Sequence, residues 1–151
     1  MDSSLRGIAD YLLAQNDSST VDPVAIGPQF LPYVYILDVE REPHVRLRIR
    51  LTGTAIDQVF RRPLVGQLLE DFIHGPRGGD VIASFHHCVR TREPIWMRQI
   101  VHLKERAPRF IEGVAVYLEP DRIYGGLVVG ELGFPGVEAG FERAALTRAD
   151  V

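Results

Sequence analysis

Hydrophobic positions first repeat with helical spacing and then with strand spacing. Apolar residues recur at i, i+3, i+4, i+7 and i+8 near the start and predict an amphipathic helix that ends near Asn16: Leu5, Ile8, Ala9, Leu12 and Leu13. A polar linker follows over residues 16–20. Residues 33–39, YVYILDV, have the β-branched and aromatic composition of a strand. From His44 to Leu51 polar and apolar residues alternate, which predicts a second strand and a hairpin with one wet face.

The second half of the chain predicts short helices, one longer helix and three strands. Gly53 ends the second strand, and Thr54 caps a short helix through Phe60. Residues 67–72 form another turn or two of helix after Pro63 and Gly66. Asp80 then caps a longer helix with one apolar stripe: Val81, Ile82, Phe85, Cys88 and Val89. Residues 95–103, 109–118 and 123–132 read as strands joined by connections that suit antiparallel hairpins.

Strands grouped apart from helices predict an α+β fold with an antiparallel sheet of about five strands. We divide the chain into an N-terminal helix and linker (1–20), one domain (21–132) and a flexible or docked tail (133–151), with a helical turn over 144–146.

The outer face of the predicted sheet needs a cover. The last two strands are apolar on both faces, and Trp96 and Ile100 are out of phase with the other apolar residues of their strand. We expect the N-terminal helix to cover this face, on its own sheet or on that of a second subunit. We favour the second arrangement, a homodimer. The candidate residues of this contact are Leu5, Ile8, Leu12, Leu13, Trp96 and Ile100.

Composition narrows the class of protein. The chain has 151 residues, of which 46% are hydrophobic and 25% charged, as in an ordinary soluble domain. A net charge of −3 gives no broad attraction to nucleic acid or anionic lipid. One cysteine, Cys88, excludes an internal disulfide and fits a reducing compartment. Without a secretion signal or an apolar run of about 20 residues, the sequence predicts a cytoplasmic protein with no membrane insertion.

The sequence carries no known catalytic motif. It lacks the G-x-S-x-G and H-E-x-x-H patterns, the nucleotide phosphate loop and the dinucleotide glycine pattern. The alternating Arg46, Arg48 and Arg50 are interpreted as a solvated face paired with Glu40 and Glu42 rather than as a phosphate site. Residues 86–88, His-His-Cys, point about 100° apart on a helix and cannot converge on one metal ion. We expect a non-enzyme without a metal.

The order of the predicted elements and several short sequence motifs together resemble a known family. The stretches LPYVYILDVE, VRLRIRLTGTAIDQVFRRPLVGQLLEDF, TREPIWMRQ and YGGLVVGEL are similar to the stand-alone PAS domains common in alphaproteobacteria. The resemblance covers about residues 30–132, with LTGT at 51–54 and PLVG at 63–66 at the expected separation. A departure is FRRP at 60–63, where the family usually has Gly-Arg-Asp.

The resemblance implies a five-stranded antiparallel sheet with short helices and one longer helix on one face and the N-terminal helix on the other. The short helices would form a lid over a small cavity, unless they are simply packed core. Its candidate residues are Ile56, Val59, Phe60, Leu64, Leu68 and Phe72. The implied function is a sensory or interaction module in bacterial signal transduction, which binds a small ligand, partner signalling proteins such as histidine kinases, or both.

Two alternatives stay open. One is a small cone-shaped α+β enzyme of the isomerase or dehydratase kind, which needs a pocket Asp or His dyad that the sequence does not show. The other is a haem sensor, because haem-binding PAS proteins take their axial histidine from the long helix, where His86 lies at the edge of the stripe. A flavin photosensor would need an Asn-Cys motif on an earlier helix, and Cys88 follows a histidine. We therefore predict no cofactor.

Overall fold

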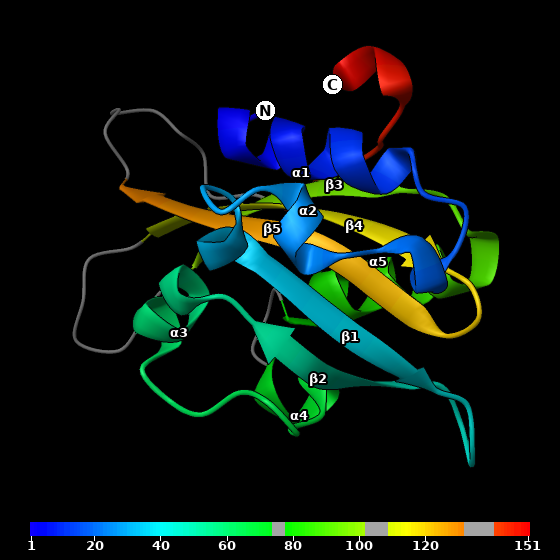
Figure 1. The fold of residues 1–151 in the computed structure, drawn as a ribbon. Helices are drawn as coiled ribbons and strands as arrows, with labels where there is room; N and C mark the ends of the chain where they lie inside the picture. Colours follow the sequence, from blue (N-terminus) through cyan, green and yellow to red (C-terminus); the bar gives the residue numbers. More distant parts are fainter. Residues whose placement is uncertain (74–77, 102–108, 132–140) are drawn as a thin grey trace.

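The computed structural model describes residues 1–73, 78–101, 109–131 and 141–151 (Figure 1). The chain begins with α1 (Ser3–Leu13), η1 (Ser18–Thr20), α2 (Pro23–Ile26), η2 (Leu31–Tyr33), β1 (Val34–Glu40) and β2 (Arg46–Thr52). It continues with α3 (Thr54–Phe60), α4 (Leu69–Phe72), α5 (Gly78–Thr91), β3 (Ile95–Val101), β4 (Arg109–Leu118), β5 (Arg122–Glu131), β6 (Glu142–Ala145) and η3 (Arg148–Asp150). The predicted α+β class is confirmed.

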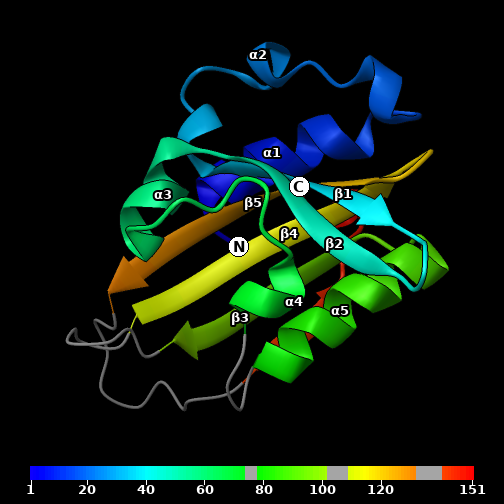
Figure 2. The same ribbon diagram turned by 90° about the horizontal axis from the view of Figure 1, so that it is seen from below.

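The strands form one six-stranded antiparallel sheet in the order β2-β1-β5-β4-β3-β6. Helix α1 lies along one face, here called the outer face, and α3, α4 and α5 lie on the inner face (Figures 1 and 2). Each face has its own hydrophobic core, and Phe85 and Cys88 of α5 belong to the inner one. In the described part of the chain, no helix is long and apolar enough to span a membrane.

Helix α1 covers the outer face of its own sheet. Leu5, Ile8 and Leu12 are at most 1% exposed, and Leu13 is partly buried. A Cβ atom at Gly126 of β5 would lie 2.8 Å from Ile8 Cδ1, so the lack of a side chain at Gly126 allows α1 to pack close to the strand. Burying each large apolar side chain contributes about 1.5–3 kcal/mol. Of the two arrangements left open by the sequence, the structure has the helix on its own chain.

Trp96 and Ile100 project from the outer side of β3. Trp96 packs against the outer core, and its Nε1 donates to Glu112 Oε2 at 2.8 Å. Glu112 is only 5% exposed, and its Oε1 accepts the backbone N–H of Asp2 at 2.8 Å. This buried carboxylate therefore ties the start of α1 to the sheet. Ile100 pairs with Phe110 of β4 and is half-buried.

The predicted helical turn over 144–146 is wrong, because Glu142–Ala145 form the sixth strand. β6 pairs with β3 from Arg98↔Glu142 to Ile95↔Ala145. Leu146 donates its N–H to Pro94 O at 2.8 Å and buries its side chain in the outer core. The open edge of β3 offers backbone partners that overrule the helical propensity of alanine. Tail residues 133–140 lie outside the described residues, as do the predicted strand ends at 102–103 and 132.

The strict alternation predicted for β2 is interrupted by a bulge. Ile49 pairs with Leu37 and Leu51 with Ile36, so Arg50 is an extra residue between them. Leu47 and Ile49 face the inner core as predicted, whereas Leu51 packs against the outer one. A bulge bends its strand and redirects the side chains beyond it.

Candidate functional site: the helical segment over the inner face

The strand-to-helix switch at Gly53 needs a glycine. A Cβ atom there would lie 2.3 Å from Pro32 O and 2.4 Å from Leu31 O, which no side chain tolerates. The Gly53 N–H donates to Val34 O at 2.8 Å. The chain thus passes against the start of β1 and continues as α3, α4 and their connection over the inner face (Figure 2). We call residues 54–73 the lid segment.

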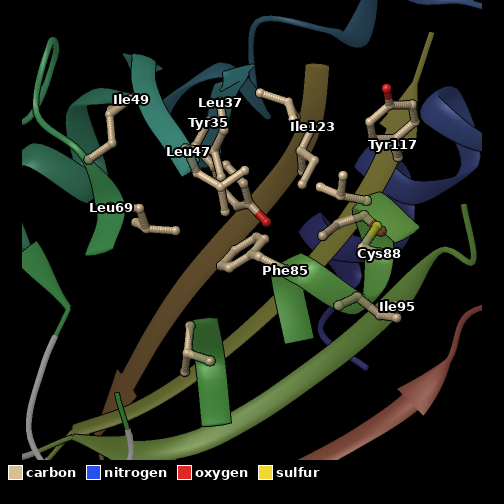
Figure 3. Close-up of a cluster of buried hydrophobic side chains, with 14 of the residues drawn as sticks. Tyr35, Leu37, Leu47, Ile49, Leu69, Phe85, Cys88, Ile95, Tyr117 and Ile123 are labelled. Atoms are coloured by element: carbon tan, nitrogen blue, oxygen red, sulfur yellow. The ribbon is translucent and has the colours of Figure 1, made fainter. Parts of the chain in front are cut away.

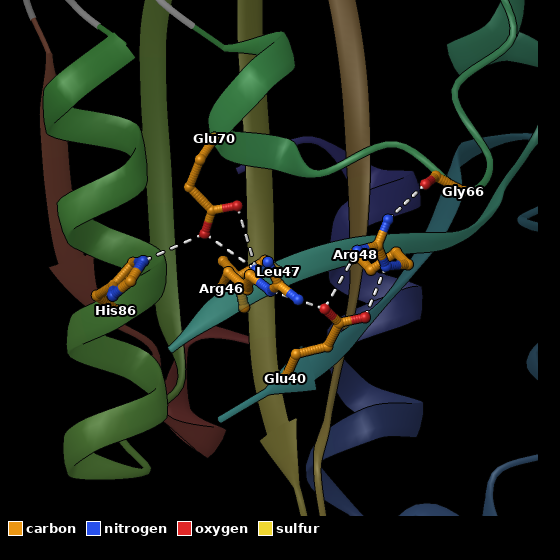
Figure 4. A network of polar contacts seen from close by, with 7 residues as sticks. All are labelled: Glu40, Arg46, Leu47, Arg48, Gly66, Glu70 and His86. Carbon is orange, nitrogen blue, oxygen red and sulfur yellow. Dashed lines mark hydrogen bonds and ion pairs between the residues drawn. The ribbon is translucent and has the colours of Figure 1, made fainter. Parts of the chain in front are cut away.

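Backbone contacts fasten the lid segment to the exposed edge of β2. Ile49 donates its N–H to Gln67 O at 2.9 Å and accepts that of Gly66 at 2.8 Å. Further along, the N–H of Leu47 donates to both oxygens of Glu70, at 3.0 and 3.2 Å (Figure 4). These contacts satisfy edge groups that would otherwise be open to pairing with another chain.

The alternating arginines of β2 are held by carboxylates of β1. Glu40 accepts from Arg46 at 2.9 Å and from Arg48 at 2.6 Å (Figure 4). The hydrogen bond from Arg48 lowers the pKa of Glu40. Arg48 also donates to Gly66 O at 2.8 Å, so it links β1 to the lid segment. Arg50 pairs with Asp38 rather than with the predicted Glu42.

The predicted lid residues divide between the core and its rim. Ile56 and Leu64 are 4% and 3% exposed, and Val59 is half-buried. Phe60 and Phe72 are partly buried and stack edge to face at 5.0 Å, with the Arg62 guanidinium 5.0 Å from the Phe72 ring centre. Leu68 is half-buried and forms a bridge with Arg48.

Leu69, which the sequence did not single out, fills the core beside Leu68. It is 6% exposed and points into the inner core (Figure 3). Helix α4 has only four residues, and so few positions do not reveal which of two adjacent leucines faces inward.

Tyr35 and Phe85 form the centre of the inner core. Their rings meet edge to face at 6.1 Å, and the Tyr35 hydroxyl donates to Val114 O at 2.7 Å (Figure 3). Burial raises the pKa of Tyr35 well above its ordinary value and that of Cys88 to about 11. Both groups are therefore neutral near pH 7, and Cys88 is a poor nucleophile there.

His86 faces a carboxylate. Its Nε2 lies 3.3 Å from Glu70 Oε1, and 31% of its side chain is exposed (Figure 4). His87 contacts Glu93 at 3.2 Å instead of pointing freely to water. Within the described ranges, no three His, Cys, Asp or Glu side chains gather closely enough to hold a metal ion.

One polar group on the inner side of β3 has no partner. Gln99 pairs with Ile111 and follows Met97 on the same face, and its Oε1 is buried. None of the described residues offers this oxygen a hydrogen bond. The sequence signal was available, because Gln99 is in phase with the inward apolar residues Ile95 and Met97.

The site thus combines an apolar core, a fastened lid segment with aromatic residues at its rim, and one unpaired amide oxygen. Models of known protein families, curated proteins and solved structures were each compared with the chain, and none matched it.

Proposed function

We propose that this chain is a non-catalytic PAS-type sensory or interaction module of bacterial signal transduction. The order of β1 to β5, with short helices and then α5 between β2 and β3, supports the proposal because it is the order that the sequence resemblance implies. Binding of a small molecule under the lid segment would shift the lid against β2. Short helices suit this role because they are intrinsically weak and depend on their contacts.

The observation that carries the proposal is the unpaired Gln99 oxygen. A buried acceptor without a partner costs about 1–3 kcal/mol of stability. An apolar ligand with one N–H or O–H donor would remove that cost. The site would bind this ligand in preference to an analogue without the donor, because the analogue leaves the Gln99 oxygen unpaired.

The state of the polar groups supports a non-catalytic role. Glu40 is occupied by two guanidinium groups, and burial keeps the Cys88 thiol protonated. Among the described residues, the His86–Glu70 pair is one that resembles the dyad that a cone-shaped enzyme needs. Glu70 already accepts the Leu47 N–H, so the pair serves first to attach α4. The contact with Glu70 also occupies the Nε2 nitrogen through which His86 would bind a haem iron, which argues against a haem sensor.

Signalling partners such as histidine kinases belong to the same proposal, on the strength of the resemblance. The homodimer stays a prediction. The argument that a second subunit is needed to cover the outer face is weaker, because α1 already buries that face within one chain. Analytical sedimentation of the full chain at tens of micromolar tests this prediction. A monomer at that concentration would contradict it.

Native mass spectrometry tests ligand binding. The protein is purified from a bacterial host, and its mass is compared before and after denaturation, with identification of any released small molecule. We expect a released molecule with an N–H or O–H donor, and at least about ten-fold less of it from a Gln99→Leu variant. A wild-type protein that releases nothing and binds none of a library of small apolar donors would contradict the proposal.

A further inference from the structure

An open groove of about 500 Å³ lies between the linker after α1, the β4–β5 turn and the strands β1, β2 and β5. Its polar lining residues are Ser18, Ser19, Asp38, Arg50, Asp121 and Arg122. None of these polar residues belongs to the lid segment or the inner core, whereas the apolar Val39 borders both the groove and the inner core. The polar groups of the groove are therefore separate from the site proposed above.

Two arginines share one carboxylate in this groove. Arg50 Nη1 contacts Asp38 Oδ2 and Arg122 Nε contacts Asp38 Oδ1, each at 3.1 Å. Charge-assisted pairs are commonly shorter, about 2.7–2.9 Å, and often bidentate. A guanidinium has five N–H donors. Among contacts within the described ranges, Arg50 uses one and Arg122 uses a second only toward Tyr124, at 3.3 Å. Each arginine therefore keeps donors for another acceptor.

The β2 bulge puts Arg50 in this position. Arg50 is the residue left over between the pairs Ile49↔Leu37 and Leu51↔Ile36. Bulges often redirect a side chain next to a functional site. Half of the Arg50 side chain is exposed, compared with 33% for Arg122 and 31% for Asp38. A ligand can reach all three groups while the protein partly shields them from water.

Contacts fix the walls of the groove and neutralise one of its two carboxylates. The Ser18 N–H donates to Glu119 O at 2.8 Å, which holds the linker against the β4–β5 turn. Asp121 is paired with Arg41 at 2.8 Å. The lining holds two arginines, at 50 and 122, and two carboxylates, at 38 and 121. Arg41, outside the lining, neutralises Asp121, so the two lining arginines face only the shared carboxylate of Asp38.

We propose that the groove binds a small molecule through an oxyanion, a carboxylate or phosphate group that bridges Arg50 and Arg122. Planar forked guanidinium donors match the oxygens of both groups. Ser18 and Ser19 of the linker also line the groove. The Ser19 hydroxyl already donates to Asp17, so it is the Ser18 hydroxyl that can donate to the same anion. The site would give the module a second input, independent of the inner face.

NMR titration of the 15N-labelled protein tests the proposed anion site with two probes, inorganic phosphate and succinate. The ionic strength is held constant with chloride, which also serves as the control anion. We expect saturable shifts of the backbone amides at residues 18, 19, 50 and 122 with at least one probe. The stronger probe identifies the group. Arg122→Gln should weaken binding at least about ten-fold. Arg46→Gln is the matched control, because it removes a paired arginine of β2 outside the groove and should change affinity less than about two-fold.

Arg122→Gln also removes an ion pair of Asp38, so a second variant is needed that blocks the groove and keeps both Asp38 pairs. Ser19→Glu places a carboxylate in the groove while leaving both arginines and Asp38 in place, and it should abolish binding. It removes one exposed hydrogen bond, from the Ser19 hydroxyl to Asp17, so the domain should stay folded with a small loss of melting temperature. Shifts that do not saturate would overturn the proposal, as would equal weakening by Arg46→Gln and Arg122→Gln. Undiminished binding by Ser19→Glu would also overturn it.

Discussion

The Glu70 carboxylate accepts the backbone N–H of Leu47 at 3.0 Å and so joins α4 to the edge strand β2 (Figure 4). Glu70→Ala removes this acceptor and the contact with His86. Hydrogen bonds to charged groups contribute about 1.5–3 kcal/mol. Glu70 is 26% exposed, so we expect a loss of about 1–2 kcal/mol in urea denaturation.

The Leu47 amide should also exchange its hydrogen faster in Glu70→Ala. Asp71→Ala, at the exposed neighbouring position, is the control and should stay within about 0.5 kcal/mol. Unchanged Leu47 exchange in Glu70→Ala would mean that the lid segment is attached mainly by its backbone contacts.

Among the glycines that the structure describes, Gly125 of β5 leaves the least room for an added methyl group. Its Cβ atom would lie 2.2 Å from Val114 O and 2.3 Å from the Tyr35 hydroxyl oxygen. Gly125→Ala should therefore displace Tyr35 and cost at least about 2 kcal/mol by thermal or urea unfolding. Gly130→Ala on the same strand is the matched control, since its nearest neighbour would be Phe110 at 3.8 Å. Equal stability of the two variants would contradict the close packing of Tyr35.

Phe85 and His87 test the orientation of α5. Phe85 is 6% exposed in the inner core, so Phe85→Ala should cost about 3–5 kcal/mol. His87 makes one contact with the half-exposed Glu93, and His87→Ala should stay within about 0.5 kcal/mol. Comparable shifts in melting temperature would place the apolar stripe on the wrong side of the helix.

Periodic segments were predictable from the sequence, whereas features that depend on tertiary contacts were not. The stripe of α1 and the alternation of β2 up to Ile49 follow directly from side-chain spacing. The β2 bulge, the choice of Leu69 over Leu68 and the strand β6 are each decided by a neighbouring element. Glu142–Ala145 has no strand pattern of its own and pairs because the edge of β3 is available. The sequence shows Gln99 in phase with the inward residues of β3, but the burial of its side-chain oxygen could be inferred only once it is known which elements cover that face.

Cys88 gives the protein a dependence of stability on alkaline pH. Burial raises its pKa to about 11, from 9.0 for a free thiol. Between these values the unfolded chain loses the thiol proton while the folded chain keeps it. The folded state then binds more protons, so the free energy of unfolding falls as pH rises, by at most about 1.4 kcal/mol per pH unit for this group. Well below pH 9 the thiol is protonated in both states and this loss is absent.

Cys88→Ala tests this dependence through its slope. The variant has a lower stability at every pH, because it removes a buried side chain. What should change is the fall in the free energy of unfolding between pH 8.5 and 10, which we expect to be smaller than in the wild type. Tyr35 is present in both proteins, and burial, rather than the smaller effect of Cys88, is the main cause of its raised pKa. Urea denaturation at four pH values in this range measures the two slopes, and parallel slopes would mean that the thiol ionises as readily in the folded protein as in the unfolded chain.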